Sequence, residues 1–237
     1  MKELSLPEPA ISWHTARDGW AELIHWLGMV GATLGKFATE IAVLMRSEVG
    51  ELREPYQTGR GSSSTMPQKR NPISAPPVIA IANRLRECVG TQLTAMIQEH
   101  ERSVAGQPLE WLVIPEAFGL ISGALKHSRQ TLEGLDVDVE QMRRNLDSSG
   151  GFLMAESVMM GLAPHTGRNK AHHMVSEAST RALEQGQTLI ESVLGDKNIM
   201  AHLSESEVNE LFEPSSYLGC VEEMMDAVLS KQKRKNL

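Results

Sequence analysis

Aromatic residues and cysteines are scarce in this chain of 237 residues. Phe, Trp and Tyr make up only 4% of it, and the two cysteines, Cys88 and Cys220, are too few for a disulfide framework. We therefore expect a reducing compartment and a cytoplasmic location. No segment has the roughly 18 consecutive apolar residues of a membrane span and no signal peptide is visible, so we expect no membrane partner.

Positive charge is also in short supply. The chain has 23 Lys and Arg residues against 30 Asp and Glu residues, and its formal net charge is -7. A general nucleic-acid binder needs a basic face, so we expect no nucleic-acid partner. The same balance permits a local basic pocket for an anionic substrate.

Strand-like alternation is missing from the whole sequence, which predicts an all-α fold. Apolar residues between positions 23 and 44 follow a heptad spacing, which is typical of a helix packed lengthwise on another helix. The members of this stripe are Leu23, Leu27, Val30, Leu34, Phe37, Ile41 and Leu44. Gly28, Gly31 and Gly35 each cost a helix about 1 kcal/mol relative to Ala, so they indicate close approach of a neighbouring backbone.

Further helices follow this first one. Asn71 and Pro72 suit the N-cap and first position of a second long helix. A third long helix should be broken or kinked near Pro115. Shorter helices fill the remainder, one of them opened by a capping box at Ser204 and Glu207.

These elements predict two parts. Residues 1–135 should belong to a long-helix bundle, and residues 136–237 should form a small all-helical C-terminal domain. The loop at residues 59–72 separates the first two long helices. It combines glycines, which allow close approach to a ligand, with three consecutive serines and the cations of Lys69 and Arg70.

Two simpler interpretations of the loop at residues 59–72 need to be considered. A generic Gly/Ser run is most often a solvated linker, which explains the small residues but not the segment 66–71. A phosphate-binding P-loop is excluded because Gly-Lys-Ser/Thr is missing. The helix start after Asn71 adds to the attraction for anions. We therefore interpret residues 59–72 as a loop that closes over an anionic substrate.

Residues 62–72 resemble the signature loop of the fumarase/aspartase superfamily, usually Gly-Ser-Ser-x-Met-Pro-x-Lys-x-Asn-Pro. Ser62 departs from this form, because the superfamily usually has Gly there. The resemblance implies that Ser63, six residues before Lys69, is the catalytic residue. It also implies that Lys69 and Asn71 bind substrate. The other loop residues that we assign to the substrate site are Ser62, Ser64, Thr65 and Met66.

Segments on both sides of the loop are similar to the 3-carboxy-cis,cis-muconate cycloisomerase branch of the superfamily, notably residues 12–18, 100–103 and 110–116. This resemblance implies that Arg102 clamps a substrate carboxylate, although a surface ion pair is the plain alternative. His14 becomes a candidate for lining the pocket, although a histidine at a helix end is more often structural. We expect no metal, because His100-Glu101 lacks the second histidine of a zinc motif.

Adenylosuccinate lyases resemble the chain less well. They share Arg102 and Glu110, but they usually have an arginine where this chain has Trp111 and a glutamine where it has Trp13. Both changes remove polar groups suited to a nucleotide. An adenylosuccinate or other fumarate-releasing lyase is therefore the second hypothesis.

The resemblance implies a cycloisomerase of aromatic catabolism in the β-ketoadipate pathway. It would act on a small polycarboxylate, need no cofactor, and transfer a proton at the carbon alpha to a carboxylate. Superfamily members are homo-oligomers, most often tetramers, whose composite active sites draw on several subunits. They are about twice as long, so we expect this chain to correspond to a C-terminal half. A helical module that only assembles, without activity, is the third hypothesis.

Overall fold

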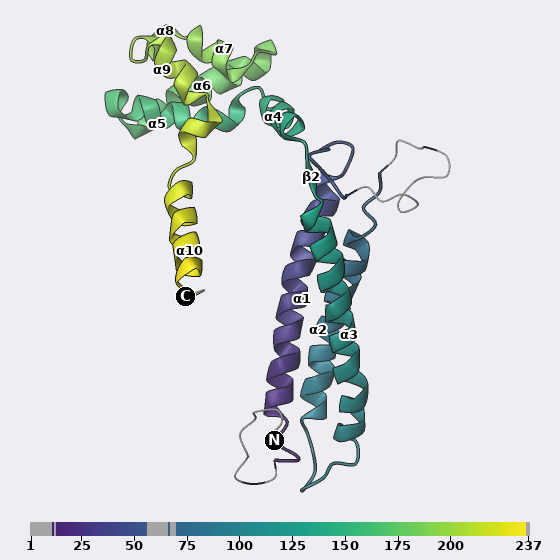
Figure 1. The fold of residues 1–237 in the computed structure, drawn as a ribbon. Coiled ribbons are helices and arrows are strands. Elements are labelled where there is room, and N and C mark those ends of the chain that lie inside the picture. Colours follow the sequence, from purple (N-terminus) through teal and green to yellow (C-terminus); the bar gives the residue numbers. More distant parts are fainter. Residues whose placement is uncertain (1–10, 12, 56–65, 67–69, 236–237) are drawn as a thin grey trace. The chain divides into compact units, whose positions relative to one another are not determined.

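The computed structural model describes residue 11, residues 13–55, residue 66 and residues 70–235 (Figure 1). Most of this part is helical, so the predicted all-α fold is confirmed. The chain forms two compact units, Met1–Gln141 and Met142–Leu237. The sequence analysis placed its boundary six residues earlier, before the short strand β2, which pairs with a strand of the first unit.

The first unit is a bundle of three long helices that lie side by side (Figure 1). They are α1 (Asp18–Leu44), α2 (Ala75–Ala95) and α3 (Gly106–Glu133). Strand β1 (Leu52–Arg53) follows α1 and pairs antiparallel with β2 (Asp136–Val137) at one end of the bundle. This two-stranded pair was not predicted, because two residues are too short to show an alternation.

Small residues bring α1 and α2 close together. A Cβ atom added to Gly31 would lie 2.5 Å from the Leu85 side chain, and one added to Gly35 would lie 2.7 Å from Ala82. The predicted close approach of a neighbouring helix is therefore confirmed. The predicted stripe is partly wrong, because the face that α1 buries also uses Gly31, Gly35 and Ala38, while Phe37 is 50% exposed.

The second helix begins later than expected. Its first residue is Ala75 and its N-cap is Ser74, whereas the sequence predicted a start at Asn71-Pro72. The Ser74 side chain makes no capping hydrogen bond. Pro76 and Pro77 occupy the first turn instead, where the missing N–H groups cost little.

Pro115 does not break the third helix, which runs without interruption from Gly106 to Glu133. Proline removes one hydrogen bond, to the carbonyl four residues earlier. Pro115 and Trp111, whose carbonyl is freed, are both exposed. Water can therefore satisfy that carbonyl, which is why the helix tolerates the proline.

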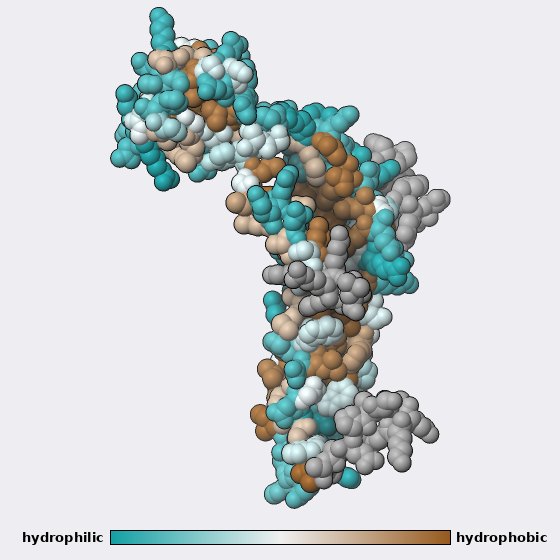
Figure 2. All heavy atoms as spheres, turned by 60° about the vertical axis from the view of Figure 1, so that its left-hand side comes forward, coloured by the Kyte–Doolittle hydropathy of each residue, from teal (hydrophilic) through white to brown (hydrophobic). Residues whose placement is uncertain are grey.

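Both α1 and α3 are long and apolar enough, by length and composition, to cross a membrane. Core helices of a bundle pass the same test, and these two pack against each other and against α2. Only 28% of each apolar window is buried within the chain. Apolar surface accordingly interrupts the polar surface of the bundle (Figure 2). Exposed apolar surface of this extent is typical of a surface that is buried against another protein segment or chain.

The second unit is built from short helices around its own core. Helix α4 (Val139–Asp147) crosses the boundary, and the 3-10 turn η2 (Phe152–Met154) follows it. The remaining elements are α5 (Ala155–Thr166), α6 (Arg168–Gln185), α7 (Leu189–Leu194), α8 (Lys197–Met200), α9 (Glu205–Leu211), the turn η3 (Pro214–Tyr217) and α10 (Val221–Lys235). The core is apolar, and Val158, Leu162 and Leu189 at its centre are fully buried.

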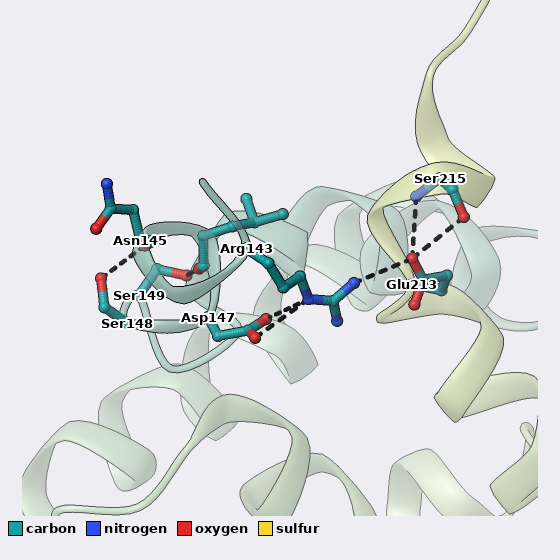
Figure 3. A network of polar contacts seen from close by, with 8 residues as sticks. Arg143, Asn145, Asp147, Ser148, Ser149, Glu213 and Ser215 are labelled. Carbon is teal, nitrogen blue, oxygen red and sulfur yellow. Dashed lines mark hydrogen bonds and ion pairs between the residues drawn. The ribbon is translucent and has the colours of Figure 1, made fainter. Parts of the chain in front are cut away.

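Polar contacts fix the ends of these short helices. The capping box predicted at Ser204 and Glu207 is confirmed. Arg143 in α4 pairs with Asp147 on its own helix and with Glu213 beside η3, at 3.0 and 3.5 Å (Figure 3). The hydrogen bonds that Arg143 donates to the Asp147 carboxylate raise the pKa of Arg143. Because all three side chains are about half exposed, this network contributes orientation more than stability.

Candidate active site

The candidate site residues of the signature loop lie mostly outside the described residues. This applies to Ser62, Ser63, Ser64, Thr65 and Lys69, whose assignments stay predictions. Within the described part of the loop, Met66 is 44% exposed and Asn71 is half-buried. Arg70 lies 3.8 Å from Asp136 of β2, both side chains being half exposed.

A buried carboxylate holds the chain where the loop joins α2. Glu54, only 5% exposed, accepts hydrogen bonds from the backbone N–H groups of Ile73, Ser74 and Ala75, at 2.9 to 3.1 Å. It thereby satisfies amides that have no partner within the helix, and its negative charge interacts favourably with the helix dipole. The start of this helix was expected to attract substrate anions, but a carboxylate of the chain itself accepts from its first N–H groups.

Replacing Glu54 with Ala should destabilise the first unit by about 2 kcal/mol or more, because buried N–H groups would lose a charged acceptor. The effect can be measured by urea unfolding followed through tryptophan fluorescence. All four tryptophans precede residue 142, so the signal reports the first unit alone.

Glu133→Ala is the matched control for this change. It removes an exposed carboxylate that pairs with Arg129 one turn away, at 2.8 Å. Such pairs contribute at most about 0.5 kcal/mol. Equal losses from the two variants would contradict the capping role of Glu54.

At the opposite end of α2, three helices are joined by a buried polar network. Arg17, at the start of α1, makes a two-pronged ion pair with Glu110 of α3, and its Nε lies 3.0 Å from the carboxylate. The two side chains are 19% and 2% exposed. Gln92 of α2 is fully buried and donates to the same carboxylate at 2.8 Å. The network thus fixes the ends of all three helices relative to one another.

His14 and Arg102 lie beside this network. Arg17 donates to the His14 backbone carbonyl at 3.3 Å, which fixes the turn that carries the imidazole. The His14 Nε2 atom is buried and makes no hydrogen bond with the residues that the structure describes. Arg102 is exposed in the connection between α2 and α3. The exposed Arg102 side chain is thus available to a ligand or to another chain, whereas the His14 Nε2 atom is not in contact with solvent.

The connection that carries Arg102 is itself held in place. Ser103 donates to Glu99 at 2.7 Å and accepts from the Gly106 N–H at 2.9 Å, at the start of α3. The hydrogen bond from Ser103 lowers the pKa of Glu99. His100 adopts a left-handed backbone conformation, with φ of 51°, which is uncommon outside glycine and asparagine.

The candidate residues therefore form two groups at opposite ends of α2. Asn71 lies four residues before its start, whereas Arg102 follows its end and His14 is linked to that end through Arg17, Glu110 and Gln92. The helix has 21 residues, which corresponds to about 30 Å. A small polycarboxylate cannot span that distance. One chain alone does not bring these residues to the same substrate.

Sequence reasoning missed two parts of this arrangement. Glu54 was not assigned, because it lies 19 to 21 residues before the amides that it binds and so gives no local signal for a cap. Arg17 and Glu110 were noted only as parts of matching segments. Their pairing across 93 residues of sequence has no local signal. Within the parts of the chain that the structure covers, no group of three His, Cys, Asp or Glu side chains could hold a metal ion.

Two family models match the chain. One, described as "Lyase", matches residues 2–86. The other, described as "Adenylosuccinate lyase C-terminus", matches residues 151–228. The two matches cover α1, the first part of α2 and most of the second unit.

Individual relatives match almost the whole chain. A 3-carboxy-cis,cis-muconate cycloisomerase of Acinetobacter baylyi is 40% identical over 98% of the chain and 51% of the relative. Trans-aconitate decarboxylase 1 of Mycosarcoma maydis is 39% identical over 97% of the chain and 47% of the relative. The crystal structure of the 3-carboxy-cis,cis-muconate lactonizing enzyme of Pseudomonas putida superposes with a TM-score of 0.91 and 37% identity, covering 100% of the chain and 52% of that protein. The chain thus spans about half the length of the relatives it matches.

Proposed function

This chain belongs to the fumarase/aspartase lyase superfamily, and from that premise we propose that it is part of a 3-carboxy-cis,cis-muconate cycloisomerase. The observation that carries the proposal is the identity of about 40% to cycloisomerases of several bacteria over nearly the whole chain. The reaction belongs to aromatic catabolism, and we place it in the cytoplasm.

The proposed chemistry is a proton transfer coupled to ring closure. One substrate carboxylate adds to the conjugated double bond and forms a lactone, while the carbon alpha to another carboxylate gains a proton. Ser63 delivers that proton in the lactonising direction and removes it in reverse. Lys69 and Asn71 hold the substrate carboxylate and stabilise the charge that develops on it. Arg102 clamps a further carboxylate through paired hydrogen bonds.

The separation of the two residue groups supports a composite site. Asn71 precedes α2 and Arg102 follows it, and the helix is about 30 Å long, so a substrate bound through Asn71 of one chain would meet the Arg102 of another. The apolar surface left on the bundle is available for such an assembly (Figure 2). We therefore propose a homo-oligomer, a tetramer in the simplest case, with sites shared between subunits.

A second candidate is another lyase that acts on a small polycarboxylate. The trans-aconitate decarboxylase is as similar as the cycloisomerases. N-acetyl-S-(2-succino)cysteine lyases are 32–33% identical over 96–97% of the chain. The match of the second unit to an adenylosuccinate lyase model points in the same direction. Trp13 and Trp111 weigh against a nucleotide substrate, because both side chains are large, apolar and exposed.

A substrate panel separates these candidates. We expect the assembled enzyme to consume 3-carboxy-cis,cis-muconate, seen as loss of the conjugated diene absorbance, and to release no fumarate from adenylosuccinate or succinocysteine derivatives. The chain should be assayed alone and together with the half of the Acinetobacter baylyi relative that the match leaves uncovered.

The two preparations also test the third hypothesis. Activity only in the combined preparation would show that this chain is incomplete by itself. Fumarate release in either preparation would favour the second candidate. No activity with any substrate in either preparation would leave an assembly module.

A further inference from the structure

Helix α10 (Val221–Lys235) is exposed along the part whose side chains the structure describes. Every residue from Val221 to Ser230 is exposed. The five large apolar side chains of this helix are between 44% and 67% exposed. They are Val221, Met224, Met225, Val228 and Leu229. No other helix of the second unit leaves so many apolar side chains uncovered within the described residues.

These five side chains share one face of the helix. Counted from Val221, they occupy positions i, i+3, i+4, i+7 and i+8, which is the pattern of a helix that packs by one stripe. A helix of 15 residues is marginal in water without tertiary support. The helix and its stripe therefore both require a partner.

Charge along α10 is divided between its two halves. Glu222, Glu223 and Asp226 lie in the first half. The sequence of the second half, residues 231–235, contains four basic residues. Two such helices side by side in parallel would bring like charges together. In the antiparallel arrangement, the acidic half of each helix lies along the basic half of the other, which lowers the electrostatic energy.

We propose that α10 pairs antiparallel with α10 of a second copy of this chain. The two apolar stripes pack on each other, with Met225 of one helix against Val228 of the other. Because the pair is antiparallel and symmetric, this contact occurs twice, once on each side of the two-fold axis. This contact aligns the acidic half of each helix with the basic half of its partner. The stripe is short, so the contact strengthens an assembly rather than creating one alone.

The charge distribution also decides against two other occupants. An anionic lipid surface attracts helices whose polar face is basic throughout. A nucleic acid likewise needs an uninterrupted basic surface. The three acidic residues of the first half would face either of them. A second copy is the partner whose charges match along the whole helix.

A spin label on Cys220 tests the pairing in the intact chain. Cys220 is exposed immediately before α10, whereas Cys88 is buried in the bundle. With Met225 opposite Val228, each Cys220 lies thirteen positions along the helix from its counterpart. At about 1.5 Å per residue, with the lateral spacing of two helices, pulsed electron resonance should report a distance of about 20–25 Å.

Two variants serve as comparison. Val228→Asp places a charge in the stripe and should abolish the distance, whereas Leu183→Asp changes an equally exposed apolar residue of α6 and should keep it. A distance near 10 Å would show a parallel pair and overturn the proposal. The absence of a distance in the wild-type chain, or one that survives Val228→Asp, would overturn it as well. These distance measurements do not depend on catalysis, so they test the helix pairing independently of the proposed function.

Discussion

Mixing chains that carry Ser63→Ala with chains that carry Arg102→Ala should restore activity that neither variant has alone. In the proposed site, the loop of one chain and the arginine of another act on the same substrate. Each variant assembled by itself has every site defective, and Ser63→Ala should lose nearly all turnover. In a random mixture, a site functions when its loop comes from one variant and its arginine from the other. Recovery of roughly a quarter of the wild-type rate is therefore expected. The measurement is the rate of diene consumption after the variants are unfolded and refolded together.

A mixture of Ser63→Ala and Lys69→Ala provides the matched control. Both residues belong to one loop, so every site in that mixture has a defective loop and no activity should return. Recovery in the control would mean that loop residues act from different chains. No recovery in the first mixture would contradict the shared site. Near-normal turnover of Ser63→Ala by itself would remove Ser63 from its proposed role.

Replacing Glu110 with Ala should cost the first unit about 3–5 kcal/mol. The substitution leaves the largely buried guanidinium of Arg17 without its counter-charge and takes an acceptor from Gln92. An unpaired charge in a helix bundle is far more costly than a missing surface ion pair. Urea unfolding followed by tryptophan fluorescence measures the loss in this unit.

Two further variants show whether charge is the cause. Glu116→Ala breaks the ion pair with Arg84 on the surface of the bundle, at 2.7 Å, and should cost at most about 1 kcal/mol. The double variant Arg17→Met/Glu110→Leu removes both charges and should recover most of the stability lost in Glu110→Ala. A double variant as unstable as Glu110→Ala would mean that packing volume, not the unpaired charge, determines the loss.

The long helices could be predicted because their signals are local and repeated. The stripe that begins at Leu23 and the glycines at positions 28, 31 and 35 both indicated a helix packed closely along another, and α1 lies on α2 in that way. The exact face could not be predicted. A glycine-lined contact buries small residues, which carry little weight in a pattern of apolar side chains.

The start of α2 could not be predicted because its cap comes from elsewhere in the sequence. Asn71-Pro72 has the local appearance of a helix start, but Glu54 provides the acceptor from a position 19 to 21 residues before the amides that it binds. Glu54 directly follows β1, whose pairing with β2 is itself a contact between distant segments of the sequence. The Arg17–Glu110 pair is a similar case, because it depends on the tertiary arrangement of α1 and α3.

Composite sites were expected from the resemblance, and the described residues Asn71 and Arg102 lie on opposite sides of α2, which is consistent with them. Sequence resemblance identifies residues that serve one reaction but does not tell which copy of the chain each comes from. Asn71 and Arg102 lie 31 positions apart in the sequence, with all of α2 between them. The rigidity of that helix keeps them apart in any one chain.

Glu54 fastens the chain on both sides of the signature loop, so the segment from residue 55 to residue 72 begins and ends at fixed points of the bundle. The bundle fixes the distance between the two ends of that segment. The entropic cost of closing the segment then changes only slowly with its length. Substitutions and small insertions inside it leave both fastenings in place. The scaffold can therefore keep its stability while the loop varies, which offers one physical route by which a single helical framework could acquire different lyase and cycloisomerase reactions.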